Sequence, residues 1–381
     1  MKTEKQGSDM EIIVTKGDLC RELQLVQGIV ERKNSIPILS NVLVRATGGG
    51  LEIAATDLDV SLRCGCPAQV AKEGSIALGA KKLYEIARAL PDSAIHLTVF
   101  ADSWTTIECE SVTFKMAGFP GEDFPSLPSS QEGSPVELDG KLLGQLIERT
   151  SFAITGEDAR YYLAGALLLV ESDAVGLVAT DGHRLSYARA GQKSTGQAEE
   201  TRILVPRKAI HELARLLELG ERVTFQRVEN HLVFSVAGRT LYSKTVEGQF
   251  PSFEKVTGLA GDKKVEVGTE ALATAVRRVS LLSAERSRAI RVGLSNDTLE
   301  VSASSPELGE AREQLKVQYA GADLQVGFNA QYLLDFLAVV GAERVRLELS
   351  SQEGRALLVP QHGPEQPPPI DYRYVVMPMR I

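Results

Sequence analysis

The triplet Ala55-Thr56-Asp57 recurs 124 residues later as Ala179-Thr180-Asp181, and Ala303-Ser304-Ser305 follows after a further 124 residues. Each triplet ends a short apolar or alternating run, which is typical of a half-buried β-strand. A fixed spacing of this length is the sequence signature of an internal repeat. The chain of 381 residues is therefore expected to contain three similar parts of about 127 residues each.

Two further echoes have nearly the same spacing. Glu85-Ile86-Ala87-Arg88 is matched by Glu212-Leu213-Ala214-Arg215, 127 residues later. Asp123-Phe124-Pro125-Ser126 is matched by Gln249-Phe250-Pro251-Ser252, 126 residues later. Three independent markers with one spacing make chance an unsatisfactory explanation.

The order of elements also recurs within each part. A strand leads into an amphipathic helix, several strands follow, and a second helix precedes more strands. The first helices are expected at Asp18 to about Arg32, Asp139 to about Phe152 and Thr269 to about Leu282, with Asp18, Asp139 and Thr269 as N-caps. The second helices are expected near residues 81–90, 207–217 and 329–340. This pattern predicts an α+β fold of three tandem copies, each with two helices packed on antiparallel sheets.

Irregular, polar segments indicate where one copy ends and the next begins. The expected division is 10–134, 135–261 and 262–381. Residues 1–9 are expected either to be an N-terminal extension or to precede the real start of the protein at Met10.

The composition excludes several classes of protein. Hydrophobic residues make up 43% and charged residues 24%, as in ordinary globular chains rather than disordered ones. No apolar run reaches the roughly 18 residues of a membrane-spanning helix, and residues 1–10 lack the apolar stretch of a signal peptide. Cys64-Gly65-Cys66 is too tight for a zinc site and no His pair accompanies it. We therefore expect a cytoplasmic protein with free cysteines and no metal or other cofactor.

Positive charge is concentrated in the expected helices. The whole chain carries a net charge of −8, but the six helical segments, counted as residues 19–33, 81–90, 141–150, 207–217, 271–282 and 329–340, together carry +7, which leaves −15 for the rest. Lys and Arg on a helix usually mark only a solvated face. Five positive helices in an acidic chain instead favour a helical surface that faces a polyanion, through phosphate contacts that carry no sequence information.

Several motifs together resemble the bacterial DNA sliding clamp, the beta subunit of the replicative DNA polymerase III. The resemblance extends from about Met10 to Ile381, in the right order. The motifs are Asp158-Ala159-Arg160-Tyr161-Tyr162-Leu163, Ala179-Thr180-Asp181-Gly182-His183-Arg184-Leu185, Val205-Pro206-Arg207-Lys208, Phe250-Pro251 and Tyr374-Val375-Val376-Met377-Pro378-Met379-Arg380.

The resemblance implies a head-to-tail homodimer that forms a ring of six similar domains, with helices lining the hole. Such a ring encircles duplex DNA without reading its sequence and tethers polymerase, clamp loader and repair proteins, which dock through short hydrophobic peptides. It has no catalytic activity. The inner, DNA-facing residues implied by the resemblance or by helix position are Lys33, Lys81, Lys82, Arg88, Arg149, Arg207, Lys208, Arg215, Arg277 and Arg278.

The resemblance also implies a peptide-binding groove between the second and third domains. Its apolar residues would accept an aromatic or leucine anchor, and its Arg and His side chains would bind peptide carbonyls or acidic flanks. Lys255 stands where relatives often carry Arg, so a bidentate contact is not expected there. The groove residues are Arg160, Leu163, Thr180, Gly182, His183, Arg184, Leu185, Pro251, Lys255, Val256, Asn329, Tyr332, Val375, Val376, Met377, Pro378, Met379 and Arg380.

A third set of residues is implied at the contact that closes the ring. Lys82, Phe114 and Met116 of one subunit would face Leu281 and Leu282 of the next, near Glu307, Glu310 and Glu313. Positions where relatives often have arginine read Trp104, Ser111 and Thr113 here, so a weaker or rearranged electrostatic contribution is expected.

Two alternatives stay open at this point. The chain can be a specialised clamp paralogue, for example one that confers antibiotic resistance through an altered groove. Asp181 and His183 can instead form a hydrolase pair, although no Gly-x-Ser-x-Gly motif accompanies them.

Overall fold

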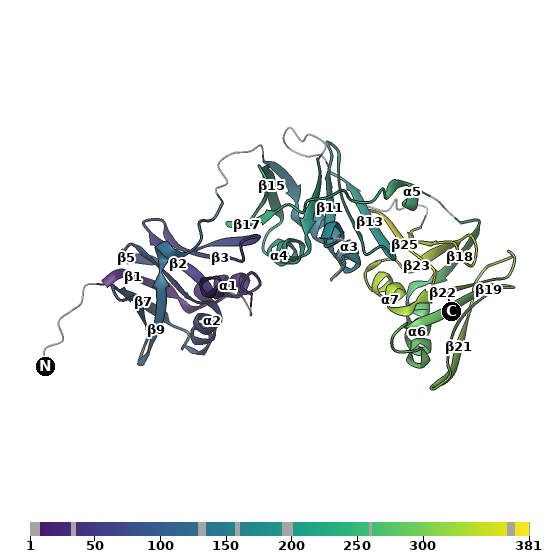
Figure 1. Ribbon diagram of the computed structural model, residues 1–381, viewed down its shortest axis with the longest axis horizontal. Coiled ribbons are helices and arrows are strands. Elements are labelled where there is room, and N and C mark those ends of the chain that lie inside the picture. Colours follow the sequence, from purple (N-terminus) through teal and green to yellow (C-terminus); the bar gives the residue numbers. More distant parts are fainter. Residues whose placement is uncertain are drawn as a thin grey trace. The chain divides into compact units, whose positions relative to one another are not determined.

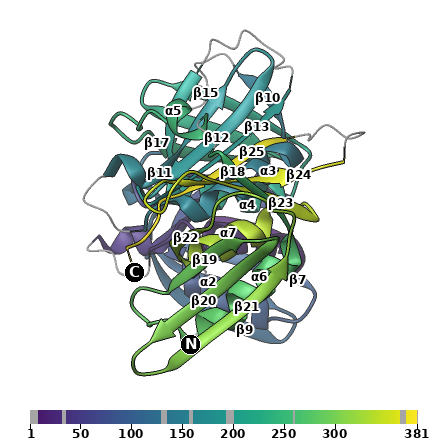
Figure 2. The ribbon, with the colours of Figure 1, turned by 90° about the vertical axis from the view of Figure 1, so that its right-hand side faces the viewer.

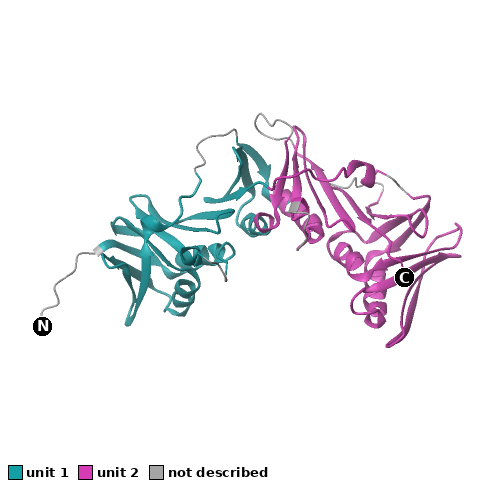
Figure 3. Ribbon diagram, in the orientation of Figure 1, with its two compact units in different colours: residues 1–141, 211–245 teal, residues 142–210, 246–381 magenta. Residues whose placement is uncertain are grey.

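The computed structural model describes residues 8–31, 36–128, 135–156, 161–192, 201–258, 261–363 and 370–380. The chain forms two compact units (Figure 3). Unit 1 contains Met1–Lys141 and His211–Thr245, and unit 2 contains Leu142–Ile210 and Val246–Ile381. No helix within the described ranges is long and apolar enough to cross a membrane.

Unit 1 is built on a 13-stranded sheet whose neighbouring strands are antiparallel (Figure 1). In spatial order the strands are β10 (Val136–Asp139), β15 (Arg222–Val228), β16 (His231–Val236), β17 (Arg239–Lys244), β4 (Val60–Cys66), β3 (Gly50–Thr56), β2 (Asn41–Thr47), β6 (Gly74–Gly79), β9 (Val112–Pro120), β8 (Trp104–Cys109), β7 (Ala94–Phe100), β1 (Ser8–Thr15) and β5 (Gln69–Lys72).

Helices α1 (Lys16–Val26) and α2 (Ala80–Ala89) pack against each other in unit 1, and α1 lies on β3 and β4. The short 3-10 helix η1 (Pro37–Ser40) precedes β2, and η2 (Gly121–Asp123) follows β9. α1 ends well before Arg32, at a turn over residues 27–29. Gly28 in that turn leaves room for the side chain of Glu212, because a Cβ there would stand 2.1 Å from Oε1 of Glu212.

Unit 2 contains an 8-stranded and a 4-stranded antiparallel sheet. The first has the order β14 (Thr201–Pro206), β11 (Gly165–Val170), β12 (Ala174–Thr180), β13 (Arg184–Gly191), β25 (Ile370–Val376), β24 (Ala356–Gln361), β23 (Arg344–Leu349) and β18 (Lys263–Gly268). The second has the order β21 (Gly309–Lys316), β20 (Thr298–Ser305), β19 (Ala289–Ser295) and β22 (Leu324–Asn329).

Helices α6 (Thr269–Val279) and α7 (Ala330–Val339) pack together in unit 2, and α6 covers β20 and β21 (Figure 2). The ring of Phe336 on α7 stacks on Tyr374 of β25 with centroids 5.0 Å apart, which anchors α7 on the larger sheet. The remaining short helices are η3 (Ser151–Ala153), η4 (Tyr161–Leu163), α5 (Glu254–Thr257) and η5 (Ser280–Leu282). The unit boundaries pass through α3 (Gly140–Thr150) and α4 (Arg207–Leu217).

The six helices predicted from the sequence are all present, but two of the predicted N-caps are wrong. Thr15 caps α1, because its Oγ1 accepts a hydrogen bond from the amide of Asp18, which therefore lies in the first turn. Gly268 occupies the N-cap of α6, and Thr269 is already helical and donates its hydroxyl to the carbonyl of Ala342. Asp139 directly precedes α3, as expected.

The two units do not coincide with three repeats because sheets run across the junctions. β17 of the second repeat pairs with β4 of the first, and β25 of the third pairs with β13 of the second. The strands of the middle repeat therefore belong to two different continuous sheets. The expected boundaries near 134 and 261 fall at segments 129–134 and 259–260, which lie outside the described residues.

The repeat is visible at atomic level in two turns. Asp57 Oδ1 accepts from the amides of residues 59 and 60 at 2.9 and 2.7 Å, and Asp181 Oδ1 accepts from those of residues 183 and 184 at 2.9 and 3.0 Å. Thr56 and Thr180 each accept from the amide two residues on, at 3.0 Å. The recurring Ala-Thr-Asp triplet thus fixes the same turn after β3 and after β12.

Candidate peptide-binding groove

A pocket of about 200 Å³ opens in unit 2 beside the turn between β12 and β13. Its walls come from four places: η4, that turn, the segment around Pro251, and the end of β25. The lining residues are Tyr162, Leu163, Thr180, Gly182, His183, Arg184, Leu185, Pro251, Ser252, Val256, Val375 and Met377. Ten of these twelve were expected from the sequence.

The floor of the pocket is apolar and rigid. Leu185 and Val375 face each other as partners in the β13–β25 ladder and belong to one buried cluster with Phe253. Leu163 is 1% exposed, whereas the side chain of Met377 is 45% exposed at the rim. An apolar floor with the flexible thioether of Met377 at its edge is suited to apolar ligands of varied shape.

The β12–β13 turn gives the pocket its polar side. Gly182 has φ of +86°, a conformation that favours glycine, and its amide bonds to Thr180 Oγ1. The carbonyl of His183 accepts a hydrogen bond from the amide of Met377 at 2.8 Å, which fastens the end of β25 to the turn. The imidazole of His183 stands exposed beside the pocket.

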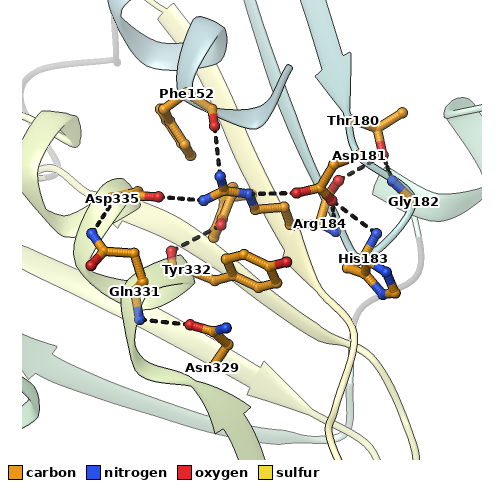
Figure 4. A network of polar contacts seen from close by, with 11 residues as sticks. Phe152, Thr180, Asp181, Gly182, His183, Arg184, Asn329, Gln331, Tyr332 and Asp335 are labelled. Atoms are coloured by element: carbon orange, nitrogen blue, oxygen red, sulfur yellow. Dashed lines mark hydrogen bonds and ion pairs between the residues drawn. The ribbon is translucent and has the colours of Figure 1, made fainter. Parts of the chain in front are cut away.

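Arg184 supports the wall of the pocket from behind (Figure 4). Its Nε donates to Asp181 Oδ2 at 3.0 Å, one Nη donates to Asp335, and the other donates to the carbonyl of Phe152 at 2.6 Å. Its guanidinium also lies 4.3 Å from the centre of the Tyr332 ring, a cation–π contact. Arg184 thereby ties the turn to α7 and to η3.

The charge of Arg184 is fixed by these contacts. Burial acts against it, but the neighbouring Tyr374 and Asp335 raise the pKa of the guanidinium above its ordinary value. The side chain is only 10% exposed and three of its nitrogens already donate to protein acceptors. These contacts position the wall of the groove, and the expectation that Arg184 also binds peptide carbonyls stays a prediction.

The other expected groove residues lie around the pocket. Asn329 caps α7 through the amide of Gln331, and Tyr332 stacks on Arg184, so both support the wall. Val376 is fully buried, Lys255 is exposed on α5, and Pro378 is half-buried beyond the rim. Met379 and Arg380 line a neighbouring pocket of about 220 Å³. Arg160 lies outside the described residues.

Two lining residues were not predicted as groove residues. Ser252 stands in the Phe-Pro-Ser echo next to Pro251, and Tyr162 stands in the motif that supplied Leu163. Both were therefore within reach of sequence reasoning, because each is adjacent to a residue that was chosen.

The expected DNA-facing cations lie on helices. Lys81, Lys82 and Arg88 are on α2, and the first two are 84% and 68% exposed, each within 4 Å of Glu85. Arg149 is on α3, Arg207, Lys208 and Arg215 are on α4, and Arg277 and Arg278 are on α6. Lys33 lies outside the described residues.

Three of these arginines also make structural contacts. Arg215 pairs with Glu212 at 2.7 Å and donates to the carbonyl of Gln24 at 3.0 Å, while Arg278 pairs with Glu313 at 3.0 Å. Arg149 lies over the Tyr372 ring. Their charges are partly neutralised or held in place, whereas Arg277 is exposed near the end of α6.

The residues expected at the ring-closing contact occupy two strand edges. Phe114 and Met116 are half-buried on β9, and Glu310 and Glu313 lie on β21. Leu281 is 77% exposed on η5, next to half-buried Leu282, and Glu307 is exposed in the turn before β21. The side chain of Leu281 is therefore available for contact with another chain.

Asp181 is committed to holding the turn. Its two oxygens accept from the amides of His183 and Arg184 and from the Arg184 guanidinium. These bonds account for its position beside His183 without catalysis.

Comparisons with known proteins identify relatives over nearly the whole chain. Three family models match: the N-terminal domain of the DNA polymerase III beta subunit over residues 10–128, the central domain over 137–252 and the C-terminal domain over 259–380. The beta sliding clamps of Pseudomonas aeruginosa and Pseudomonas putida are 37% and 38% identical over 374 residues, covering 98% of this chain and all of each relative.

Solved structures agree with these matches. A crystal structure of the Pseudomonas aeruginosa sliding clamp bound to griselimycin has a TM-score of 0.90 at 37% identity, covering 98% of this chain and 100% of that one.

Proposed function

Since this chain belongs to the DNA polymerase III beta subunit family, the beta sliding clamps, we propose that two copies close head to tail into a ring around duplex DNA. The chain is a non-catalytic sliding clamp of DNA replication with three clamp domains. Nothing in the comparisons favours a specialised paralogue or a hydrolase. This conclusion rests on the matches to three successive domains over nearly the whole chain. We further propose that the domain boundaries lie near residues 134 and 261 and that the protein is cytoplasmic.

Two strand edges of the chain support the ring. Residues 112–117 of β9 pair with β8 on one side, and β21 pairs with β20 on one side; the described strands leave the other side of each open. Open edges are prone to pair with another chain. At the two junctions between repeats within the chain, the corresponding strands do pair with each other, β17 with β4 and β25 with β13.

The internal repeat predicts which residues would face each other if β9 of one subunit paired with β21 of the next. Thr56 corresponds to Ser304 in the triplet, and their ladder partners are Ser61 and Glu310, so Ser61 corresponds to Glu310. Ser61 pairs with Tyr242 of β17, three residues after the start of that strand at Arg239.

β17 begins at Arg239 and β9 begins at Val112, each after a two-residue hairpin turn, so Arg239 corresponds to Val112. Three residues further along each strand, Tyr242 corresponds to Lys115. Lys115 of one subunit is therefore expected directly opposite Glu310 of the next, on the exposed face of both strands. Opposite charges at facing positions stabilise antiparallel pairs.

The same correspondence explains the exposed Leu281. Phe152 is its counterpart, since η3 and η5 begin with Ser151-Phe152 and Ser280-Leu281. The ring of Phe152 lies 5.6 Å from that of Tyr374, whose counterpart on β9 is Phe114. Leu281 is thus expected to bury its side chain against Phe114 of a second copy.

DNA would be held by the helices. The exposed cations on α2, α4 and α6 suit weak, exchangeable phosphate contacts, which permit sliding because they read no bases. The pocket of unit 2 would receive short apolar peptide segments of the polymerase, clamp loader and repair proteins. The sliding clamp of Pseudomonas aeruginosa has been solved bound to griselimycin, which supports ligand binding by members of this family.

Retention on DNA circles tests the proposal. Clamp loaded on a nicked circle should stay bound through gel filtration and be released when a restriction enzyme linearises the circle. Linear DNA with blocked ends is the matched control and should retain the clamp. Equal retention on blocked and free-ended linear DNA would contradict encirclement, and a monomeric mass in solution would contradict the closed ring.

A further inference from the structure

Unit 1 contains a second pocket, of about 480 Å³, at the place that the internal repeat makes equivalent to the groove. The turn after β3 forms one wall, as the turn after β12 does in unit 2. Pro125 and Ser126 line it where Pro251 and Ser252 line the groove. The amide of Lys244 bonds to the carbonyl of Asp59 at 2.8 Å, as that of Met377 bonds to His183.

The chemistry of this second pocket differs from that of the groove. Tyr242 and Ser61 occupy the positions in this pocket that Val375 and Leu185 occupy in the groove, and Asp59 occupies the position of His183. The lining of the groove, as far as the structure describes it, contains no carboxylate, whereas the second pocket has the carboxylates of Asp59 and Glu229. Lys244 lies 2.9 Å from Asp59 and neutralises one of the two.

Leu58 adds an apolar contact at the rim. It has φ of +80°, where the groove has Gly182 at +86°, and its side chain is 45% exposed. A left-handed conformation is costly for a leucine, and an exposed leucine gains nothing from burial within its own chain. With Pro125 and Leu127 it offers an apolar surface next to the two carboxylates.

We propose that this pocket of unit 1 is a second docking site, whose occupant is a short peptide segment with a basic residue next to an aliphatic one. The aliphatic side chain would lie against Leu58 and Pro125, and the basic side chain would lie by Asp59 and Glu229. The two pockets of one subunit then select segments of different charge, because only the second presents carboxylates. This inference does not require that the ring be closed.

Methyl NMR of the full-length protein tests the site directly. The probes are N-acetyl-Arg-Leu-amide and N-acetyl-Glu-Leu-amide, which share the leucine and differ in charge. With ¹³C-labelled leucine methyls, and Leu58 assigned through Leu58→Met, the Leu58 signal should shift saturably with the arginine probe. Affinity for the glutamate probe should be roughly fivefold weaker, as expected for exposed charges.

Two double variants separate the charge from the fold. Asp59→Asn with Glu229→Gln should abolish the preference for the arginine probe, and Glu73→Gln with Asp92→Asn, which lie outside the lining, should leave it intact. Equal affinity for both probes, a Leu58 signal that does not move, or shifts confined to Leu163 and Leu185 would overturn the proposal. None of these results would affect retention on nicked circles, so failure here is distinguishable from failure of the clamp function.

Discussion

Arg184 shows how one side chain sets the shape of the candidate groove. It joins Asp181 of the turn, Asp335 of α7 and the carbonyl of Phe152 at a site where it is 10% exposed. Removing one partner of such a buried pair is more damaging than removing both, because a carboxylate is left without compensation.

Arg184→Ala should therefore lower the free energy of unfolding by about 3 to 5 kcal/mol. Arg184→Lys should recover only part of this, since an ammonium group lacks the planar fork that reaches three acceptors. Urea unfolding measures both, and Lys255→Ala, an exposed neighbour on α5, is the matched control with a change within about 0.5 kcal/mol. An Arg184→Ala protein as stable as the parent would refute the supporting role.

The thiols of β4 predict an alkaline limit to stability. Burial raises the pKa of the Cys66 thiol to about 12, and burial likewise raises the pKa of Cys64. A thiol with a raised pKa stays protonated in the folded state while the unfolded chain loses its proton, so stability falls as pH rises above about 9.

Thermal unfolding between pH 8 and pH 11 measures this effect. Cys66→Ala should flatten the decline of the melting temperature above about pH 9, because it removes a thiol that only the unfolded chain deprotonates there. Identical slopes for the parent and Cys66→Ala would show that other groups govern the alkaline transition.

At the scale of elements, paired edges decide how the chain associates. Both repeat junctions of the chain are closed by antiparallel ladders, whereas residues 112–117 of β9 and the strand β21 each have a partner on one side only among the described strands. Buried ion pairs link helices to these ladders. For example, Arg239 Nε on β17 donates a hydrogen bond to Glu22 of α1 at 2.9 Å. The junctions are therefore rigid where both hydrogen bonds and ion pairs cross them.

Charge reversal tests the β9–β21 register between subunits. Lys115→Glu or Glu310→Lys alone should weaken the dimer by severalfold through like charges at facing positions, and the double variant should restore it. Sedimentation equilibrium gives the dissociation constants. Lys72→Glu on β5 carries the same charge change away from both edges and should have no effect. Failure of the double variant to recover would place other residues opposite Lys115.

At the scale of the whole molecule, an acidic chain that acts on DNA must separate its charges in space. The net charge of −8 opposes general binding to DNA, while exposed cations such as Lys81, Lys82 and Arg277 lie on helices. Topological retention makes up for weak contacts, since a closed ring leaves DNA only at an end or when it opens.

Salt should therefore distinguish encirclement from adhesion. Between 50 and 200 mM salt, direct binding to short linear duplexes should fall steeply, with a slope reduced by about one for each phosphate contact removed in Lys81→Ala or Lys82→Ala. The half-life on a nicked circle should change little over the same range. A half-life that follows the linear-duplex affinity would indicate adhesion in place of encirclement.

The sequence by itself determined the threefold repeat, the six helices and the family, because these depend on local periodicity and on motifs that can be read along the chain. It also supplied most of the pocket lining, since those residues occur in the motifs. The errors were local: Thr15 and Gly268 cap helices where Asp18 and Thr269 were expected.

Only the tertiary structure decided what the shared motifs do in each place. Arg184 became a support because Asp335, 151 residues away, reaches it. The second pocket appeared because Leu58, Glu229 and Tyr242 converge from three separate stretches of chain. A sequence records which side chains are present, but distances between residues far apart in the chain are set by packing, and these distances determine which charges are paired and which surfaces stay open.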